Sequence, residues 1–278
     1  MEAVIDIRVL EECAANLEPL PTSVGRLIDL AGRFDTDVRE IVDVIQYDPA
    51  LTVKLLRAAN SAASGSIREI STVNDAVVRM GMSTVVALAT STAVSDRMRV
   101  AVLDLKPGEL WKHSVTAALA IESIRRLASR TIPPAAMTVA LLHDVGKQAL
   151  AGTLGPLCTE RIINLTNDEQ LPGHEAEQEV LKINHTELGA IAARAWKLPD
   201  IVVAGIGGHH SLGAEETQLN QAVLIADCAA YDVHSENPRG HLADGLGALN
   251  ELGLDRDDYA QIVLTTRTRF EQMADRFG

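Results

Sequence analysis

Apolar residues recur with helical spacing through most of the chain. Between residues 37 and 46, Val38, Ile41, Val42 and Ile45 fall near a 3.6-residue period, which is typical of a helix with one buried face. Only 3% of the residues are aromatic, and this composition disfavours sheets. We therefore expect an all-α protein, with helices at about 37–46, 49–60, 72–80, 82–99, 109–129, 134–150, 174–183, 185–196, from 200 onward, 217–231 and 255–275.

Capping residues stand where several of these helices should begin or end. Asp48 is a suitable N-cap, and Pro49 suits the first helical position because its missing N–H has no partner there anyway. Thr72 or Asn74 could cap the next helix, and Gly81 suits the position just beyond its end. These local signals predict separate short helices in the first third of the chain.

The pattern breaks at Lys106-Pro107-Gly108, where Pro and Gly interrupt a helix. This break predicts a boundary between two helical units, 1–104 and 105–278. The uncharged stretch from Met80 to Ser95 is shorter than the roughly 20 residues that a membrane span needs, so we expect a buried core helix. We expect the loop 235–240 to be exposed.

The charge balance narrows the classes of partner. The chain has 25 Lys and Arg against 38 Asp and Glu, a formal net charge of −13, which repels phosphate backbones and disfavours general nucleic-acid binding. The 3 cysteines lack any CxxC spacing and fit a reducing compartment. The acidic N-terminus does not resemble a signal peptide. We expect a cytoplasmic protein that does not insert into membranes.

Histidine and aspartate form an ordered series on or beside the expected helices. These residue types supply nitrogen and oxygen ligands to divalent metals. A carboxylate such as Asp144 could bridge two ions, because it has two oxygens, and two ions about 3.5–4 Å apart can clamp a phosphoryl group. The series comprises His113, His143, Asp144, His185, His209, His210 and Asp227.

Structural interpretations compete with metal binding for these residues. Asp144 could simply pair with Lys147, three positions along the same helix face. Asp227 lies in an apolar helix, where a carboxylate needs a partner, and a metal is one candidate. Elsewhere we expect a solvated helix face at 175–179, core positions for the two tryptophans, and solvated side chains for the remaining histidines, His174, His234 and His241.

The short sequence motifs around the histidines resemble those of a known family. Ala140-Leu141-Leu142-His143-Asp144-Val145-Gly146-Lys147, His185-Thr186-Glu187-Leu188-Gly189 and Gly207-Gly208-His209-His210 resemble the HD superfamily of metal-dependent phosphohydrolases. Asp48-Pro49-Ala50-Leu51-Thr52, Leu55-Leu56-Arg57-Ala58-Ala59-Asn60-Ser61 and Asp75-Ala76-Val77-Val78-Arg79-Met80-Gly81 resemble the HDOD family, the HD-related output domain of bacterial signalling proteins. The resemblance covers about residues 17 to 230.

The resemblance implies a helical HD-superfamily bundle preceded by an N-terminal helical subdomain. It also implies that all seven residues of the series are metal ligands, that Asp144 is part of the catalytic machinery and that Lys147 contacts phosphate. Many HDOD domains have lost these ligands, whereas this sequence retains the set. The Gly-Tyr-Pro signature of the related HD-GYP phosphodiesterases is missing, and Ser211-Leu212-Gly213-Ala214 stands in its place.

Three functions follow from this resemblance. The favoured hypothesis is a stand-alone bacterial regulatory module that binds a signalling protein or a nucleotide-like ligand and retains a metal site. The alternative is a phosphohydrolase of a nucleotide or another phosphoester, in which a metal-activated hydroxide attacks phosphorus. A third hypothesis is a nucleotide sensor without turnover. The all-N/O ligand set admits one or two ions of Fe, Mn, Zn, Ni or Mg, and a homodimer is compatible with each function.

Overall fold

A computed structural model describes residues 6–18, 20–33, 35–46, 48–60, 70–94, 102–103, 105–106, 108–167, 171–211, 217–234 and 242–277. These residues confirm the all-α expectation, because their only extended pairing is an isolated bridge between Val102 and Leu105. The helices are α1 Ile7–Ala15, α2 Thr22–Ala31, α3 Val38–Gln46, α4 Pro49–Ala59, α5 Val73–Met80, α6 Met82–Val94, α7 Glu109–Leu127, α8 Ala136–Leu142, α9 Lys147–Ala151, α10 Pro156–Asn167, α11 Gly173–Leu181, α12 His185–Ala195, α13 Asp200–Gly207, α14 Gln218–His234, α15 Leu242–Glu251 and α16 Arg256–Phe277.

The expected caps are confirmed. The Asp48 side chain accepts a hydrogen bond from the Leu51 N–H at the start of α4. Thr72, rather than Asn74, caps α5, and Gly81 follows that helix with a φ of 79°, a left-handed value that favours glycine. The first turn of each of these helices is thus fixed locally, by a side chain that satisfies an otherwise unpaired N–H.

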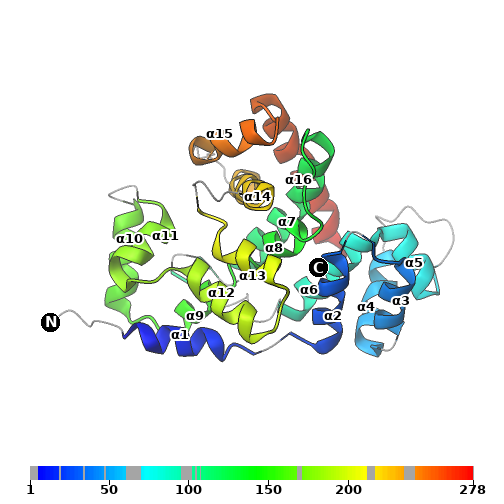
Figure 1. Cartoon of the computed structure of the whole chain (residues 1–278), viewed down its shortest axis with the longest axis horizontal. Coiled ribbons are helices and arrows are strands. Elements are labelled where there is room, and N and C mark those ends of the chain that lie inside the picture. Colours follow the sequence, from blue (N-terminus) through cyan, green and yellow to red (C-terminus); the bar gives the residue numbers. More distant parts are fainter. Residues whose placement is uncertain are drawn as a thin grey trace.

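Helices α2 to α6 pack mainly on one another, and α3, α4 and α5 lie together at one end of the molecule (Figure 1). Helices α7 and α14 pack side by side in the remainder, with α8 and α16 against them. Helix α1 departs from the order of the sequence, because it lies along α12 and α9 (Figure 1). The division at about residue 104 stays a prediction, but α1 packs on the unit that follows it.

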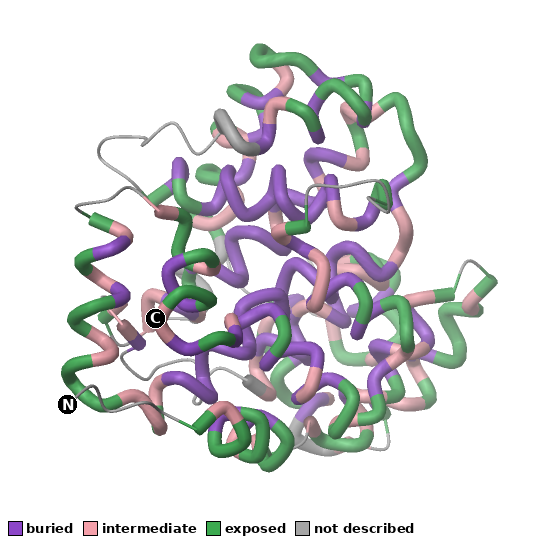
Figure 2. The backbone as a smooth tube through the Cα atoms, turned by 60° about the vertical axis from the view of Figure 1, so that its left-hand side comes forward, coloured by how far each residue is buried: buried purple, intermediate pink, exposed green. Residues whose placement is uncertain are grey.

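Buried residues run through the middle of the molecule (Figure 2). Helices α7 and α14 contribute many of them. Ten consecutive positions of α14, from Gln221 to Ala230, are buried. Burial of apolar side chains on every face of a helix supplies most of its stabilisation but leaves no solvated side for polar groups. His113 in α7 and Asp227 in α14 are therefore unusual members of this core.

Two expectations about helix extent are wrong or incomplete. The helix expected at 134–150 is broken into α8 and α9, because residues 143–146 form a tight turn. In this turn the N–H groups of Val145, Lys147 and Gln148 donate to carbonyls three residues earlier rather than four. Helices α1, α2, α10 and α15 were not predicted. The end of the helix expected at 82–99 and the loop 235–240 lie outside the described residues.

No single helix of the described residues is long and apolar enough to cross a membrane. The consecutive helices α5 and α6 together meet the criteria of length and composition, but they are bent by 107° at Gly81. In α6, Val85, Val86 and Ala89 are buried in the protein core, as expected for the uncharged stretch.

Asn60 joins the end of α4 to the chain that leads into α5. Its side chain accepts from the Ile70 N–H and donates to the Ile70 and Leu56 carbonyls. We expect Asn60→Ala to lower the free energy of unfolding by about 1–2 kcal/mol, since three hydrogen bonds at an exposed position are lost. Asn16→Ala is the control, because Asn16 makes one equivalent bond, to the Glu12 carbonyl. Equal effects of both variants in urea unfolding would contradict this prediction.

Candidate metal centre

Five elements bring the histidine and aspartate series together. His113 lies in the first half of α7, and Asp227 lies in the middle of α14, which packs against α7. The other members lie at helix ends, where the chain changes direction. His143 and Asp144 follow α8, His185 is the first residue of α12, and His209 and His210 follow α13.

The first group of side chains contains His113, His143, Asp144 and Asp227. His113 Nε2 lies 2.8 Å from Asp227 Oδ1 and 3.3 Å from His143 Nε2. His143 Nε2 lies 3.5 Å from both Asp144 Oδ2 and Asp227 Oδ1. One ligand atom from each of His113, His143 and Asp144 fits within a span of 4.8 Å, which is compatible with a shared metal ion.

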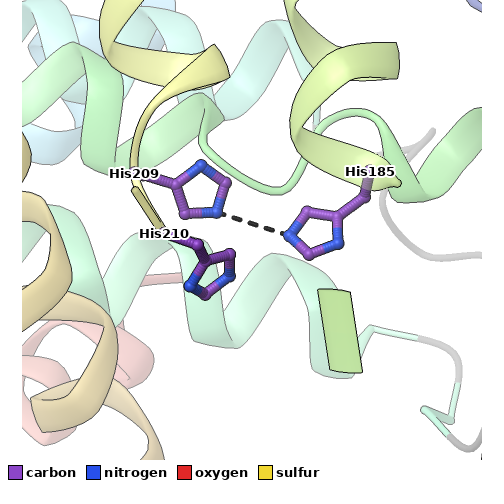
Figure 3. A group of neighbouring side chains, drawn as sticks. All are labelled: His185, His209 and His210. Carbon is purple, nitrogen blue, oxygen red and sulfur yellow. Dashed lines mark hydrogen bonds between the residues drawn. The ribbon is translucent and has the colours of Figure 1, made fainter. Parts of the chain in front are cut away.

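The second group contains three histidines, His185, His209 and His210, whose rings face one another across the gap between α12 and α13 (Figure 3). His185 Nε2 lies 3.4 Å from His209 Nε2. One nitrogen from each of the three rings fits within 4.8 Å of the others. His185 and His209 are buried, and His210 is less so.

Asp144 lies between the two groups and contributes an oxygen to each. Its Oδ2 atom faces His143, while its Oδ1 atom lies 3.3 Å from His185 Nε2. Residue 144 lies in the tight turn after α8. Its side chain therefore does not follow the path that an uninterrupted helix would give it. A single carboxylate therefore connects the two groups of imidazoles.

The second ring nitrogen of three histidines is fixed by hydrogen bonds. His143 Nδ1 lies 2.7 Å from the Ala140 carbonyl, and His209 Nδ1 lies 2.7 Å from the Ile206 carbonyl. A carbonyl oxygen only accepts, so each of these Nδ1 atoms must carry a hydrogen. His185 Nδ1 lies 2.7 Å from a carboxylate oxygen of Glu177. In their neutral forms, His143 and His185 consequently direct the Nε2 lone pair towards Asp144, whereas that of His209 faces His185 Nε2.

The carboxylates of the site are held ionised. Burial alone would raise the pKa of Asp144, but the charges of Lys147 and His143 outweigh it and keep that pKa well below its usual value. Burial would also raise the pKa of Asp227, and hydrogen bonds with His113 and His143 lower it instead. Two ionised carboxylates in a buried site call for positive charge close by.

The histidines respond to the same surroundings in opposite directions. Burial lowers the pKa of His209 well below its usual value and that of His210 to about 3, so both rings are neutral at pH 7. Burial acts on His143 as well, but the carboxylates of Asp144 and Asp227 outweigh it and raise its pKa. His209 and His210 thus present neutral imidazoles, which is the form that binds metals.

The donor set fits divalent metal ions. Asp144 Oδ1 accepts no hydrogen bond from the described residues, although it is buried. It lies 3.3 Å from His185 Nε2, which in turn lies 3.4 Å from His209 Nε2, so neighbouring electron-pair donors meet with no hydrogen between them. Such an arrangement is costly unless a cation lies among them. Nitrogen and oxygen donors of this kind suit divalent transition metals and Mg²⁺.

Lys147 is the buried cation of the site, with its Nζ 2.8 Å from Asp144 Oδ2. Burial would lower the pKa of Lys147, but the carboxylate of Asp144 raises it above its usual value, so the ammonium remains charged. The pairing of Lys147 with Asp144 that their three-residue spacing suggested is thus present. A contact between Lys147 and phosphate stays a prediction.

Two nearby residues differ from the expectation of solvated side chains. Glu177, within the acidic stretch 175–179, is buried and bonded to His185. His174 is half-buried, and its ring stacks on that of His210 at 4.2 Å between centroids. Neither contact leaves a signal in a sequence, because both depend on how α11 packs beside α12.

The remaining expected positions are mostly as predicted. His234 is exposed, and its Nε2 lies 2.7 Å from the Thr116 hydroxyl. Trp111 and Trp196 are half-buried against the hydrophobic core. His241 and residues 212–214, which replace the Gly-Tyr-Pro signature, lie outside the described residues.

The fold and the site define a helical protein with a buried histidine–aspartate centre. The HDOD domain model matches residues 17–212, and the chain therefore belongs to the HDOD domain family. A curated relative, an uncharacterised protein of Treponema pallidum (strain Nichols), is 24% identical over 235 residues. The match covers 81% of this chain and 45% of the relative, so the chain spans about half the length of that protein.

Solved structures share this fold. An HDOD domain protein of unknown function from Geobacter sulfurreducens is 23% identical with a TM-score of 0.68, covering 97% of this chain and 96% of its own. A protein from Shewanella amazonensis SB2B, provisionally named a phosphohydrolase, is 22% identical with a TM-score of 0.70. The match covers 97% of this chain and 98% of that protein. A provisionally named signal transduction protein from Marinobacter aquaeolei VT8 is 20% identical with a TM-score of 0.72. The match covers 94% of this chain and 59% of that protein.

Proposed function

We propose that this HDOD protein is a metal-dependent phosphohydrolase of a nucleotide or another phosphoester. The observation that carries the proposal is the position of Asp144, whose two oxygens face two separate groups of imidazole nitrogens. This is the arrangement expected of a carboxylate that bridges two ions. The family resemblance by itself favours a regulatory module, but the donor set that the fold brings together supports hydrolysis.

The two groups of residues would each hold one metal ion. One ion would be held by His113, His143 and Asp227, the other by His185, His209 and His210, and both by Asp144. Divalent ions bound there would lower the pKa of a water and neutralise negative charge on a phosphoryl group. Lys147, which is charged and buried beside Asp144, would hold the shared carboxylate in place and add attraction for phosphate.

Metal content and turnover test this proposal together. We expect freshly purified protein to contain about two divalent ions per chain and to hydrolyse some members of a phosphoester panel. The panel should include bis(p-nitrophenyl) phosphate, nucleoside mono- and triphosphates and cyclic dinucleotides. Chelation should abolish turnover and readdition of Mn²⁺ should restore it. Protein that binds no ion after reconstitution, or loaded protein that turns over nothing, would contradict the proposal.

A regulatory module is the second candidate, and the N-terminal helices favour it. The neighbouring helices α4 and α5 expose Val53 and Val78, which are 50% and 69% accessible. Charged replacements at these positions should release a protein partner without changing metal content.

Calorimetry with the nucleotides of the panel distinguishes a nucleotide sensor without turnover from a hydrolase, because a sensor would bind one of them and leave it intact.

A further inference from the structure

Glu177 reaches the candidate metal centre from α11, where it is 1% exposed. Its Oε2 atom lies 2.7 Å from His185 Nδ1 and accepts a second hydrogen bond, also of 2.7 Å, from the His185 backbone N–H. One carboxylate oxygen therefore binds both the ring and the backbone of the same histidine. The neighbouring Glu175 and Glu179, in contrast, have exposed side chains.

The chain between the two helices makes this double contact possible. Helix α11 ends at Leu181, and Lys182 adopts a left-handed conformation with a φ of 62°, which turns the chain back towards Glu177. Asn184 then caps α12 by accepting from the Thr186 and Glu187 N–H groups. Glu177 and Asn184 together satisfy three of the N–H groups that the first turn of a helix leaves unpaired.

The ring contact has a chemical consequence beyond stability. An ionised carboxylate only accepts hydrogen bonds, so it fixes the hydrogen of His185 on Nδ1 and leaves the lone pair on Nε2. That nitrogen is the atom that faces Asp144 Oδ1 at 3.3 Å and His209 Nε2 at 3.4 Å. A carboxylate behind a histidine also makes the ring a more basic ligand and fixes its orientation.

We propose that Glu177 is the positioning residue of the second group, His185, His209 and His210, which form the histidine-rich half of the centre. It determines whether the second ion binds. The inference rests on the proposed metal centre but not on hydrolysis. It applies to one half only, because Glu177 contacts His185, whereas His143 in the other half rests on the Ala140 carbonyl, which no side-chain mutation removes. Loss of the Glu177 carboxylate should therefore affect the two ions unequally.

The test compares Glu177→Ala and Glu177→Gln with Glu175→Gln, a matched change on the same helix whose side chain is 56% exposed. Elemental analysis and calorimetric titration with Mn²⁺ alone measure the number of ions and the affinity of each. We expect two ions in the wild type and in Glu175→Gln. In Glu177→Ala one ion should bind as in the wild type and the other about 10–100-fold more weakly.

Glu177→Gln keeps an oxygen acceptor but no charge, so we expect it to weaken the same ion by less than Glu177→Ala does. A merely structural role would instead lower the unfolding temperature and weaken both ions together. That result, or unchanged binding of both ions, would overturn the inference. A wild-type protein that binds fewer than two ions would overturn the proposed centre itself, whereas failure of hydrolysis alone would leave the role of Glu177 supported by the titration.

Discussion

Asp144→Asn should remove both metal ions and reduce phosphoester turnover by more than about 10²-fold, the scale for loss of one charge-stabilising group. The reason is that Asp144 faces both groups of histidines, so this single change affects both halves of the centre. The amide has nearly the shape of the carboxylate, but it has lost one of its two anionic oxygens. Metal content by elemental analysis and the rate with the best phosphoester of the panel are the two measurements.

Asp232→Asn is the matched control for this prediction. Asp232 is a second buried aspartate of α14, and it accepts a hydrogen bond from the Tyr259 hydroxyl instead of facing the histidines. Its replacement should reduce stability but leave the ions and the rate per folded molecule unchanged. An Asp144→Asn protein that keeps two ions and wild-type turnover would disprove the bridging role.

Gly146→Ala should both destabilise the protein and disturb the histidine-rich half of the centre. A Cβ atom at this position would lie 2.0 Å from the His185 carbonyl oxygen and 2.5 Å from the Gly189 nitrogen. Both are backbone atoms of α12, so the helix itself would have to move. Overpacking of this kind costs about 1–3 kcal/mol, occasionally more, which corresponds to roughly 2–4 °C in unfolding temperature per kcal/mol for a chain of this length.

Gly152→Ala is the control for Gly146→Ala, since it adds the same methyl group at the other end of α9. A Cβ atom there meets nothing within 4 Å, and the backbone φ of −90° suits any residue. We expect a change within about 0.5 kcal/mol. Calorimetric unfolding and Mn²⁺ titration of both variants give the comparison. Equal unfolding temperatures, with two ions bound in each variant, would contradict this prediction. They would show that α12 can move away from residue 146 without loss of stability or of metal binding.

Local signals predicted much of the fold. Asp48, Thr72 and Gly81 act on their own or adjacent turns, so their effect can be recognised without knowing the tertiary structure. The break after α8 could not be recognised in this way, because the apolar pattern continues through residues 134–150 and contains no proline after the start. The close contact between Gly146 and the first turn of α12 coincides with that break, and such a contact involves residues far apart in sequence.

The candidate site shows the same division. The histidines and aspartates stood out because the short motifs around them, such as Leu142-His143-Asp144-Val145-Gly146, resemble those of the HD superfamily, and the structure brings them together. Their roles as ligands stay predictions. Glu177 could not be distinguished from Glu175 or Glu179 in an acidic stretch, since only the packing of α11 against α12 decides which carboxylate is buried. Buried polar partners of metal ligands are thus harder to predict than the ligands.

The packing of α1 on α12 also has an optical consequence. Trp196, at the end of α12, donates its indole N–H to the Leu17 carbonyl just beyond α1, over a distance of 3.0 Å. The chain contains only two tryptophans, and the other, Trp111, lies in α7. Trp196 is therefore an intrinsic fluorophore at the seam between α1 and the helix that begins with His185. Its emission spectrum can follow the detachment of α1 in real time, without a chemical label.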